Sequence, residues 1–462
     1  MMKFIVSLLF VLTLLSGWSQ DNTLQCLFVG DVMQHGGQLK AAYNKNSDSY
    51  DYHDCFRFVR PVIQQADLAI ANLEVTHAGK PYKGYPQFSA PPSLSEALVN
   101  AGFNLILTAN NHSCDGGAKG VRKTLDVLDK LGVRHTGTFR NRKERDSLYP
   151  LIWEEQGMRI AVLNYTYGTN GLKVPAPLII NYIDTQVMIR DFARAKALKA
   201  DWIICTLHWG SEYKPLPDAY QKKWERFCYD QGADMVVGGH PHVLQPIVQQ
   251  HVGDRDRMTV WSLGNFVSNQ RTRYRDGGVM VRANLSKKAG KVSIASNDYV
   301  LTWVHPRQES STKPYYILPD FDYNRHFPGF LNPEELSKSK QFYEDSRKLY
   351  RDHGKGVQEF KVGQDTTLVE QYERMLGEHY TVVLETSVKP SFKTKVPAVL
   401  QEEFYQLLKH DGTYALTYGV FKDAKKAFGE ARFLKDAGLN PIGVFLVDPK
   451  TRDWKIKESE VK

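Results

Sequence analysis

Residues 235–242 read Met-Val-Val-Gly-Gly-His-Pro-His, an apolar strand-like run that ends in two histidines separated by a proline. In an extended segment residues i and i+2 point to the same side, so His240 and His242 can reach one cavity. Pro241 stiffens that geometry. Taken alone, the motif is more simply interpreted as a pair of surface loop histidines.

Four further apolar runs also end in polar residues that can bind a metal. Together with the first run they favour a chemical role for these residues over a surface loop. In a parallel sheet the carboxyl ends of the strands lie along one edge, where loops carry the functional groups. The sequence therefore predicts an α/β domain with polar side chains gathered at one sheet edge. The four runs are residues 27–30 before Asp31, 68–71 before Asn72 and Glu74, 105–108 before Asn111 and His112, and 202–207 before His208.

The first 19 residues are typical of an export signal. The apolar run 4–15 is too short to cross a bilayer as a stable helix, and Gly17 and Ser19 suit cleavage before Gln20. We therefore expect a secreted or periplasmic, envelope-associated protein with no transmembrane span after signal removal.

The composition favours anionic partners over nucleic acid. The 462 residues carry a formal charge of +9, but Lys and Arg form no consecutive block and are not interleaved with aromatic residues as in single-strand binders. Five scattered cysteines leave at least one unpaired in an exported chain, so disulfides are not the scaffold; Cys205 is expected to pack as a small hydrophobe.

Periodicity divides the mature chain into three parts. Residues 22–307 alternate strand and helix patterns, residues 308–365 look like a linker with one helix at 333–351, and residues 366–462 form a small α+β domain. The Tyr-rich and Pro-rich stretch 315–328 has a second interpretation, packing across the first domain. The other predicted helices are 55–65, 94–101, 120–131, 185–198, 219–230, 398–408 and 424–436; the other predicted strands are 159–165, 258–262, 292–304, 381–385, 414–421 and 442–447.

The ligand types at the strand ends indicate a transition-metal site. Mixed oxygen and nitrogen ligands suit Mn, Fe or Zn, whereas Mg and Ca favour oxygen alone. Two divalent metal ions could share one carboxylate and act on an anionic group. His112, beside a ligand, is the candidate general acid, and Asp115 could orient it. The candidate metal ligands are Asp31, Glu74, Asn111, His208, His240 and His242.

The ordered motifs resemble those of the CapA family over about residues 24–304. That family is associated with poly-gamma-glutamate capsule synthesis and belongs to the calcineurin-like metallophosphatase superfamily. The resemblance implies a double-sheet sandwich flanked by helices, with the six candidates above as metal ligands and His112 as the catalytic histidine. The motifs are Gly30-Asp31-Val32-Met33, Asn72-Leu73-Glu74, Asn110-Asn111-His112 with Asp115, residues 208–213 (His-Trp-Gly-Ser-Glu-Tyr), residues 239–243 (Gly-His-Pro-His-Val) with Gln245, and residues 262–266 (Ser-Leu-Gly-Asn-Phe).

Three positions depart from the pattern of the broader superfamily. Met33 stands where the superfamily has a histidine, with His35 two residues further on. Glu74 replaces an aspartate, and Ser113 replaces the acid that follows the catalytic histidine. These departures put ordinary phosphatase activity in doubt while leaving a metal site in place.

Three residues are candidates for substrate contact. Glu212 and Tyr213 follow the His208 turn and face the site or, alternatively, cap the next helix. Asn265 stands at another strand end and donates to substrate or closes a turn.

The C-terminal domain resembles the half-repeat of SPOR domains, which bind peptidoglycan glycan strands. Residues 414–421 (Tyr-Ala-Leu-Thr-Tyr-Gly-Val-Phe) precede the alanine-bearing helix 424–436 and Gly438. A plain α/β dimerisation or docking module fits the same pattern.

The sequence therefore favours a secreted, metal-binding CapA-type protein that acts on an anionic polymer or cell-wall glycan, by metal-dependent hydrolysis or transfer. A non-catalytic polymer-binding scaffold and a general periplasmic metallophosphoesterase are the alternatives.

Overall fold

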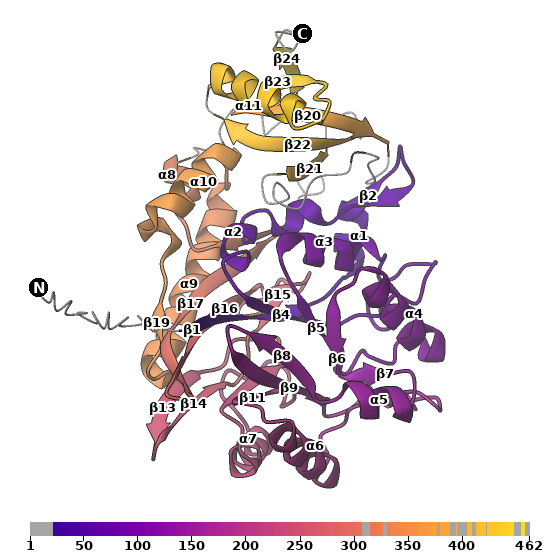
Figure 1. Ribbon diagram of the computed structural model, residues 1–462, viewed down its shortest axis with the longest axis vertical. Helices are drawn as coiled ribbons and strands as arrows, with labels where there is room; N and C mark the ends of the chain where they lie inside the picture. Colours follow the sequence, from indigo (N-terminus) through magenta and orange to yellow (C-terminus); the bar gives the residue numbers. More distant parts are fainter. Residues whose placement is uncertain are drawn as a thin grey trace, which may run out of the picture.

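The computed structural model describes residues 22–306, 315–326, 330–376, 379–388, 394, 404–408, 413–421, 423–447 and 454–457 (Figure 1). The expected export signal, residues 1–19, lies outside the described residues. Strands and helices alternate from the first described residue onward, and the predicted α/β class is confirmed.

The first sheet has a parallel half that carries candidate site residues and an antiparallel half that extends it. β1 pairs in parallel with β4 and with β15 (Asn265–Val267), and in antiparallel register with β16. Most of this antiparallel half was not predicted as separate strands. In order, the sheet runs β18 (Tyr316–Pro319), β17 (Lys291–His305), β16 (Gly277–Lys288), β1 (Asn22–Val32), β4 (Leu68–Leu73), β5 (Leu105–Leu107) and β6 (Arg134–Thr136), and β19 (Gln358–Glu359) also pairs with β17.

The second sheet has a parallel centre with antiparallel edges. β11 pairs in parallel with β9 and β12, and β12 pairs in parallel with β14. The sheet runs in the order β13 (Ile247–Val252), β14 (Arg255–Val260), β12 (Met235–Gly239), β11 (Trp202–His208), β9 (Met158–Thr166) and β8 (Leu151–Glu155).

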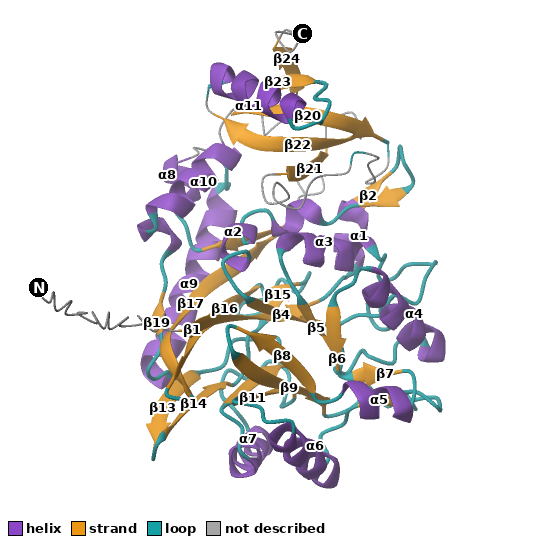
Figure 2. Cartoon of the chain, in the orientation of Figure 1, coloured by secondary structure: helices purple, strands orange, loops and turns teal. Residues whose placement is uncertain are grey.

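Alternating side chains of β11 reach two different cores. Trp202 and Ile204 join the large core that includes the first sheet, whereas Ile203, Cys205 and Leu207 pack against helices α6 and α7. This alternation follows from the two-residue period of a strand. The two sheets therefore pack face to face between layers of helices, as Figures 1 and 2 show, which is the predicted sandwich.

The helices begin and end close to the predicted residues where caps are present. Asp184 and Asp218 accept backbone N–H groups at the starts of α6 and α7. The predicted helix 55–65 is instead a 3-10 turn (His53–Phe56) followed by α2, because Pro61 lacks an N–H and favours a helix start. The helices up to residue 306 are α1 (Gly36–Ala42), α2 (Arg60–Ile63), α3 (Ser93–Ala101), α4 (Gly117–Lys130), α5 (Arg142–Leu148), α6 (Thr185–Ala197) and α7 (Ala219–Gln231).

The described part of the predicted linker packs on the first sheet. β18 pairs with β17, and helix α9 (Pro333–His353) lies along the same sheet in Figure 1. Of the two interpretations left open by the sequence, the structure has the packed one. Helix α10 (Thr366–Leu376), predicted as part of the C-terminal domain, places Leu368 and Tyr372 in the first core.

The C-terminal unit is an antiparallel sheet with one face covered by α11 (Ala424–Asp436). The prediction of a helix over residues 398–408 is wrong for residues 404–408. These residues form strand β21, because their backbone pairs with β22. The rest of the predicted helix lies outside the described residues. The SPOR likeness stays a prediction. The sheet runs β21 (Phe404–Leu408), β22 (Tyr414–Phe421), β20 (His379–Ser387), β23 (Gly443–Val447), β24 (Trp454–Lys457).

Two further findings concern membrane spans and cysteines. Among the described residues, no helix combines the length and apolar character needed to span a bilayer. All five cysteines lie within residues 22–306 and are free thiols, and Cys205 is buried as expected.

Candidate metal centre

Five of the candidate ligands come together where the strand ends of the two sheets meet. Asp31 and Glu74 belong to the first sheet, at the end of β1 and directly after β4. His208 ends β11, and His240 and His242 follow β12 in the second sheet. All five side chains are buried.

Asp31 is the most heavily bonded member of the cluster. Its Oδ1 accepts from Asn72 Nδ2 at 2.8 Å, and its Oδ2 accepts from the His240 backbone N–H at 3.1 Å. His242 Nδ1 lies 3.2 Å from Oδ2. Burial alone would raise the pKa of Asp31, but the hydrogen bond from His242 and the charge of His208 hold it well below its usual range. The carboxylate is therefore ionised at neutral pH.

Glu74 lies at the centre of the cluster without a hydrogen bond. Its side chain is fully buried, and within the part of the chain that the structure describes neither carboxylate oxygen has a hydrogen-bond partner. Its Oε1 is 3.4 Å from His208 Nε2 and 3.8 Å from His242 Nε2. Burying a carboxylate carries a large desolvation penalty, so Glu74 needs positive charge close by, from the neighbouring imidazoles or from a bound cation.

His240 and His242 are held in an unusual backbone conformation. Their φ angles are +96° and +56°, a region that residues other than glycine adopt at a cost of about 1–3 kcal/mol. Burial holds the pKa of His240 well below its usual value, and its Nδ1 has no hydrogen-bond partner among the described residues. Burial would also lower the pKa of His242, but the charge of Glu74 and the hydrogen bond to Asp31 raise it to about 9.

Asn265 orients His242. Its Oδ1 lies 3.0 Å from His242 Nδ1, and its Nδ2 donates to the backbone oxygens of His242 and Arg275. Because Asn265 is buried and its amide is engaged within the protein, the geometry favours positioning of His242 over the expected contact with substrate. His242 Nε2 is left facing Glu74, as in metal-binding histidines whose second nitrogen is held by a neighbour.

Asn111, His112 and Asp115 line the next part of the site. Asn111 Oδ1 lies 2.9 Å from His208 Nε2, which brings the sixth candidate ligand to the cluster. His112 Nδ1 is 2.9 Å from Asp115 Oδ2, and the same oxygen accepts the Phe88 N–H at 2.6 Å. The His112 ring also packs edge-on against Phe88. His112 is thereby fixed through Nδ1, and Asp115 takes the expected orienting place.

Exposed aromatic and acidic side chains surround the cluster. Tyr213 is 37% exposed, with its ring 6.2 Å from that of His242. Burial raises the pKa of Tyr167 to about 12, and the charge of Glu212 adds to that shift, which indicates that this carboxylate lies close to the opening. Tyr167 is 41% exposed, and its ring lies 4.6 Å from that of His240. The interpretation of Glu212 and Tyr213 as helix-capping residues does not hold, because Asp218 caps α7.

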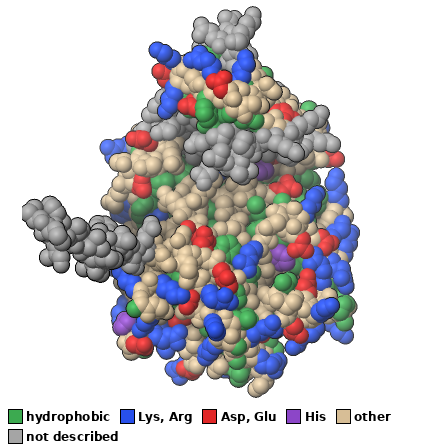
Figure 3. Space-filling model, viewed as in Figure 1, with side chains coloured by type: hydrophobic (Ala, Val, Ile, Leu, Met, Phe, Trp, Pro, Cys, Tyr) green, Lys and Arg blue, Asp and Glu red, His purple; other side chains and the backbone are tan. Residues whose placement is uncertain are grey.

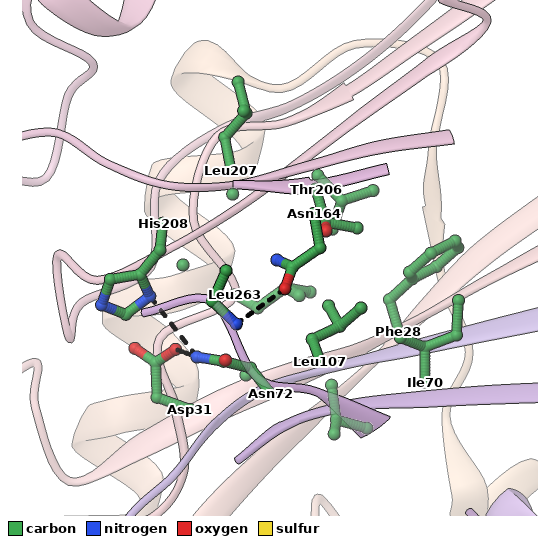
Figure 4. Close-up of a pocket in the computed structure, with 16 residues that line it drawn as sticks. Phe28, Asp31, Ile70, Asn72, Leu107, Asn164, Thr206, Leu207, His208 and Leu263 are labelled. Atoms are coloured by element: carbon green, nitrogen blue, oxygen red, sulfur yellow. Dashed lines mark hydrogen bonds between the residues drawn. The ribbon is translucent and has the colours of Figure 1, made fainter. Parts of the chain in front are cut away.

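Sequence reasoning missed Asn72 and Tyr167. Figure 4 shows Asn72 between Asp31 and His208, with a dashed line to each; the distance to His208 Nδ1 is 3.4 Å. Asn72 was visible in the sequence as a polar residue at a strand end. Tyr167 follows the last residue of β9, so the strand-end signal would have found it too.

The donor set fits divalent cations. Two triads have ligand atoms that all lie within 4.8 Å of one another, Asp31–Glu74–His208 and Glu74–His240–His242, and Glu74 belongs to both. Met33 occupies the position where the sequence analysis expected a superfamily histidine. Its side chain is buried in the core, so this position supplies no ligand. His35 is engaged elsewhere, because its Nδ1 accepts from the Asn269 N–H.

Known proteins share these segments. A family model described as "Bacterial capsule synthesis protein PGA_cap" matches residues 25–270, more than half of the chain. The chain belongs to this family. The PGA_cap match includes all six candidate ligands together with His112, Asp115, Glu212, Tyr213 and Asn265.

Two curated relatives agree with the PGA_cap assignment. The capsule biosynthesis protein CapA of Bacillus anthracis is 30% identical over 277 residues, which cover 56% of this chain and 64% of that protein. The PGA biosynthesis protein CapA of Bacillus subtilis (strain 168) is 29% identical over 322 residues, which cover 66% of this chain and 80% of that protein. The first match thus spans less than two thirds of its relative.

Solved structures overlap with this PGA_cap protein only in part. The calcineurin-like phosphoesterase YfkN from Bacillus subtilis has a TM-score of 0.38 at 13% identity, covering 61% of this chain and 90% of that chain. The NAD nucleotidase NadN of Haemophilus influenzae has a TM-score of 0.41 at 12% identity, covering 77% and 68%. Overlaps of this size carry no argument about activity.

Proposed function

We propose that this PGA_cap protein binds divalent metal at the Glu74 cluster and uses it to hydrolyse or transfer part of an anionic envelope polymer, poly-gamma-glutamate or a related capsule or wall glycan. One observation carries the proposal. Glu74 is a fully buried carboxylate that accepts no hydrogen bond from the described residues and lies among three histidines and Asp31. Such a group is stable when a cation neutralises it.

The cluster is suited to two cations that share one carboxylate. One cation would be held by Asp31, Glu74 and His208, with Asn111 Oδ1 as a further ligand. The other would be held by Glu74, His240 and His242. The mixture of imidazole, carboxylate and amide ligands favours Mn, Fe or Zn. When bound, such a pair polarises an ester or amide oxygen and lowers the pKa of water.

His112 is the proposed proton donor. Its Nδ1 is held by Asp115, which is itself fixed by the Phe88 N–H, so His112 Nε2 is the nitrogen free to give a proton to a leaving group. Asp115 also stabilises the protonated imidazole. Tyr167, Tyr213 and Glu212 at the opening would contact the substrate outside the reacting bond.

The polymer substrate is supported by family membership and by the names of the curated relatives. The chain carries a net charge of +9. Figure 3 shows Lys and Arg interspersed with Asp and Glu on the viewed face. We propose that the polymer is recognised at the site itself, where Tyr167, Tyr213 and Glu212 are exposed.

We further propose that the protein works outside the cytoplasm, after removal of residues 1–19. The C-terminal unit would dock the first domain on wall glycan, as its likeness to SPOR domains implies, with a dimerisation module as the alternative.

Elemental analysis of the purified full chain tests the metal site. After loading with Mn and dialysis, the wild-type protein should retain close to two ions per chain. Glu74→Gln removes the shared carboxylate charge and should retain less than one. His251→Gln, an exposed histidine paired with Asp256, is the matched control and should retain the wild-type amount. Wild-type protein without bound metal would refute the proposal.

Turnover separates catalysis from scaffolding. Metal-loaded protein is incubated with poly-gamma-glutamate, with wall glycan and with p-nitrophenyl phosphate. His112→Gln should keep the bound metal and lose at least about 100-fold in rate on the true substrate. If His112→Gln preserves full biological activity, the protein is a scaffold; turnover of only the small ester would identify a general phosphoesterase.

A further inference from the structure

Arg275 is a cation held flat at the opening of the metal centre. Its guanidinium carbon lies 3.3 Å from the centre of the Tyr213 ring, and that ring lies 6.2 Å from the ring of His242. Arg275 is half-buried. The stacked arrangement leaves the edge of the guanidinium, with its N–H donors, available for a planar or tetrahedral anion.

Backbone contacts fix both members of this Arg–Tyr pair to the metal ligands. The Tyr213 N–H donates to the oxygen of Pro241 at 2.8 Å, between His240 and His242. The Arg275 backbone oxygen accepts from Asn265 Nδ2 at 2.8 Å, and Asn265 in turn holds His242. The position of the guanidinium is therefore tied to the position of the cluster.

The ion pairing of Arg275 differs from that of the nearby Arg273. Within the described part of the chain Arg275 forms no salt bridge, whereas Arg273, two residues earlier, pairs with both oxygens of Asp345. Arg273 also lies over a tyrosine, with its guanidinium carbon 4.9 Å from the centre of the Tyr274 ring. Of these two arginines, Arg275 beside the metal centre is thus the one without a carboxylate partner in the described part of the chain.

We infer that Arg275 is a specificity-determining residue that binds an anionic oxygen group of the substrate, a carboxylate or a phosphate, next to the group that reacts at the metal centre. The inference rests on the proposed function and narrows its substrate class. A substrate then needs two chemical groups close together. One is the reacting bond, which reaches the Glu74 cluster, and the other is a separate anionic group, which reaches Arg275. A repeating polyanion has both in neighbouring units.

The test measures anion affinity and metal content on the same samples of full-length, Mn-loaded protein. The probes are inorganic phosphate and a short poly-gamma-glutamate, which carries carboxylates and no phosphate. Arg275→Gln should weaken binding of one probe about tenfold, the loss expected for one charge-assisted hydrogen bond. It should also flatten the salt dependence of that affinity while the metal content stays unchanged. The probe that loses affinity identifies the anion.

Arg273→Gln is the matched control and should bind both probes with wild-type affinity, since Arg273 is 53% exposed and already paired. The inference is overturned if Arg275→Gln binds both probes as the wild type does, if Arg273→Gln loses as much, or if the wild type binds neither. A wild-type protein that binds a probe through Arg275 but retains no metal would refute the proposed function and leave the anion site standing.

Discussion

At the scale of single residues, Gly239 allows the ligands of the two sheets to approach. A Cβ at this position would lie 2.7 Å from Asp31 Oδ1 and 3.6 Å from His208 Nδ1. Gly239→Ala should therefore displace the Asp31 carboxylate and weaken Mn binding at least about tenfold, because metal affinity depends on ligand geometry. Equilibrium dialysis measures the affinity. Gly36→Ala, where a Cβ meets nothing within 4 Å, should bind as the wild type does.

The pair formed by His112 and Asp115 gives a second prediction at this scale. Asp115→Asn keeps the shape but removes the charge that supports protonated His112, so the rate on the true substrate should fall about 10- to 100-fold. The metal content should not change. A wild-type rate in Asp115→Asn would show that Asp115 has only a structural role.

The candidate ligands could be predicted because each lies at or soon after the end of an apolar strand. Glu74 and His208 are examples, and the structure brings both to the cluster. Asn265 was expected at a strand end but begins β15 instead, and its hydrogen bond with His242 indicates that it positions that ring. Arg275 could not be predicted, because its partner Tyr213 is distant in the sequence and a lone arginine in a loop has no pattern.

At the scale of elements, prediction succeeded where periodicity and capping agree. α6 has an aspartate cap and one buried face, and its predicted and observed bounds differ by a single residue. Prediction failed for β21, whose few residues have a composition that suits helix or strand and are decided by pairing with β22. Long-range pairing cannot be read from a local window.

Helix α10 provides a prediction about the attachment of one element to another. Tyr372 is fully buried, packs edge-on against Phe58 and Phe321, and donates its hydroxyl to the Phe58 oxygen at 2.6 Å. Tyr372→Ala should lower the free energy of unfolding by about 3–5 kcal/mol, and Tyr372→Phe by about 1 kcal/mol. Urea unfolding followed by fluorescence measures both. Tyr43→Ala, at a tyrosine that is 41% exposed, should change little.

At the scale of the whole molecule, stability should depend on pH through His77. Burial lowers the pKa of His77 to about 4, although its hydrogen bond to the Ala90 oxygen opposes the shift. Between pH 6.5 and 4 the unfolded chain binds the extra proton, so the free energy of unfolding falls as pH falls. From pH 7 to 5 this one group should remove about 2 kcal/mol.

The pH effect is isolated by comparing wild type with His77→Gln in urea unfolding at both pH values. The stability advantage of the wild type over the variant should be about 2 kcal/mol smaller at pH 5 than at pH 7. An advantage that does not change with pH would show that His77 does not titrate in this way.

Metal binding should raise the stability of the whole first domain. A cation bound only by the folded state adds about 2.7 kcal/mol at a hundredfold excess over Kd. Mn should therefore raise the melting temperature of wild type and of His251→Gln in calorimetry. Glu74→Gln should show a much smaller rise. An equal rise in Glu74→Gln would place the stabilising cation elsewhere.

The division of the ligands between two sheets has a consequence for how the protein matures. Asp31 and Glu74 come from one sheet and His208, His240 and His242 from the other, so neither sheet alone carries a full set of ligands. A chain whose layers have not yet docked would offer the proposed metal ions only part of this set. Metal uptake would then report that the two layers have assembled.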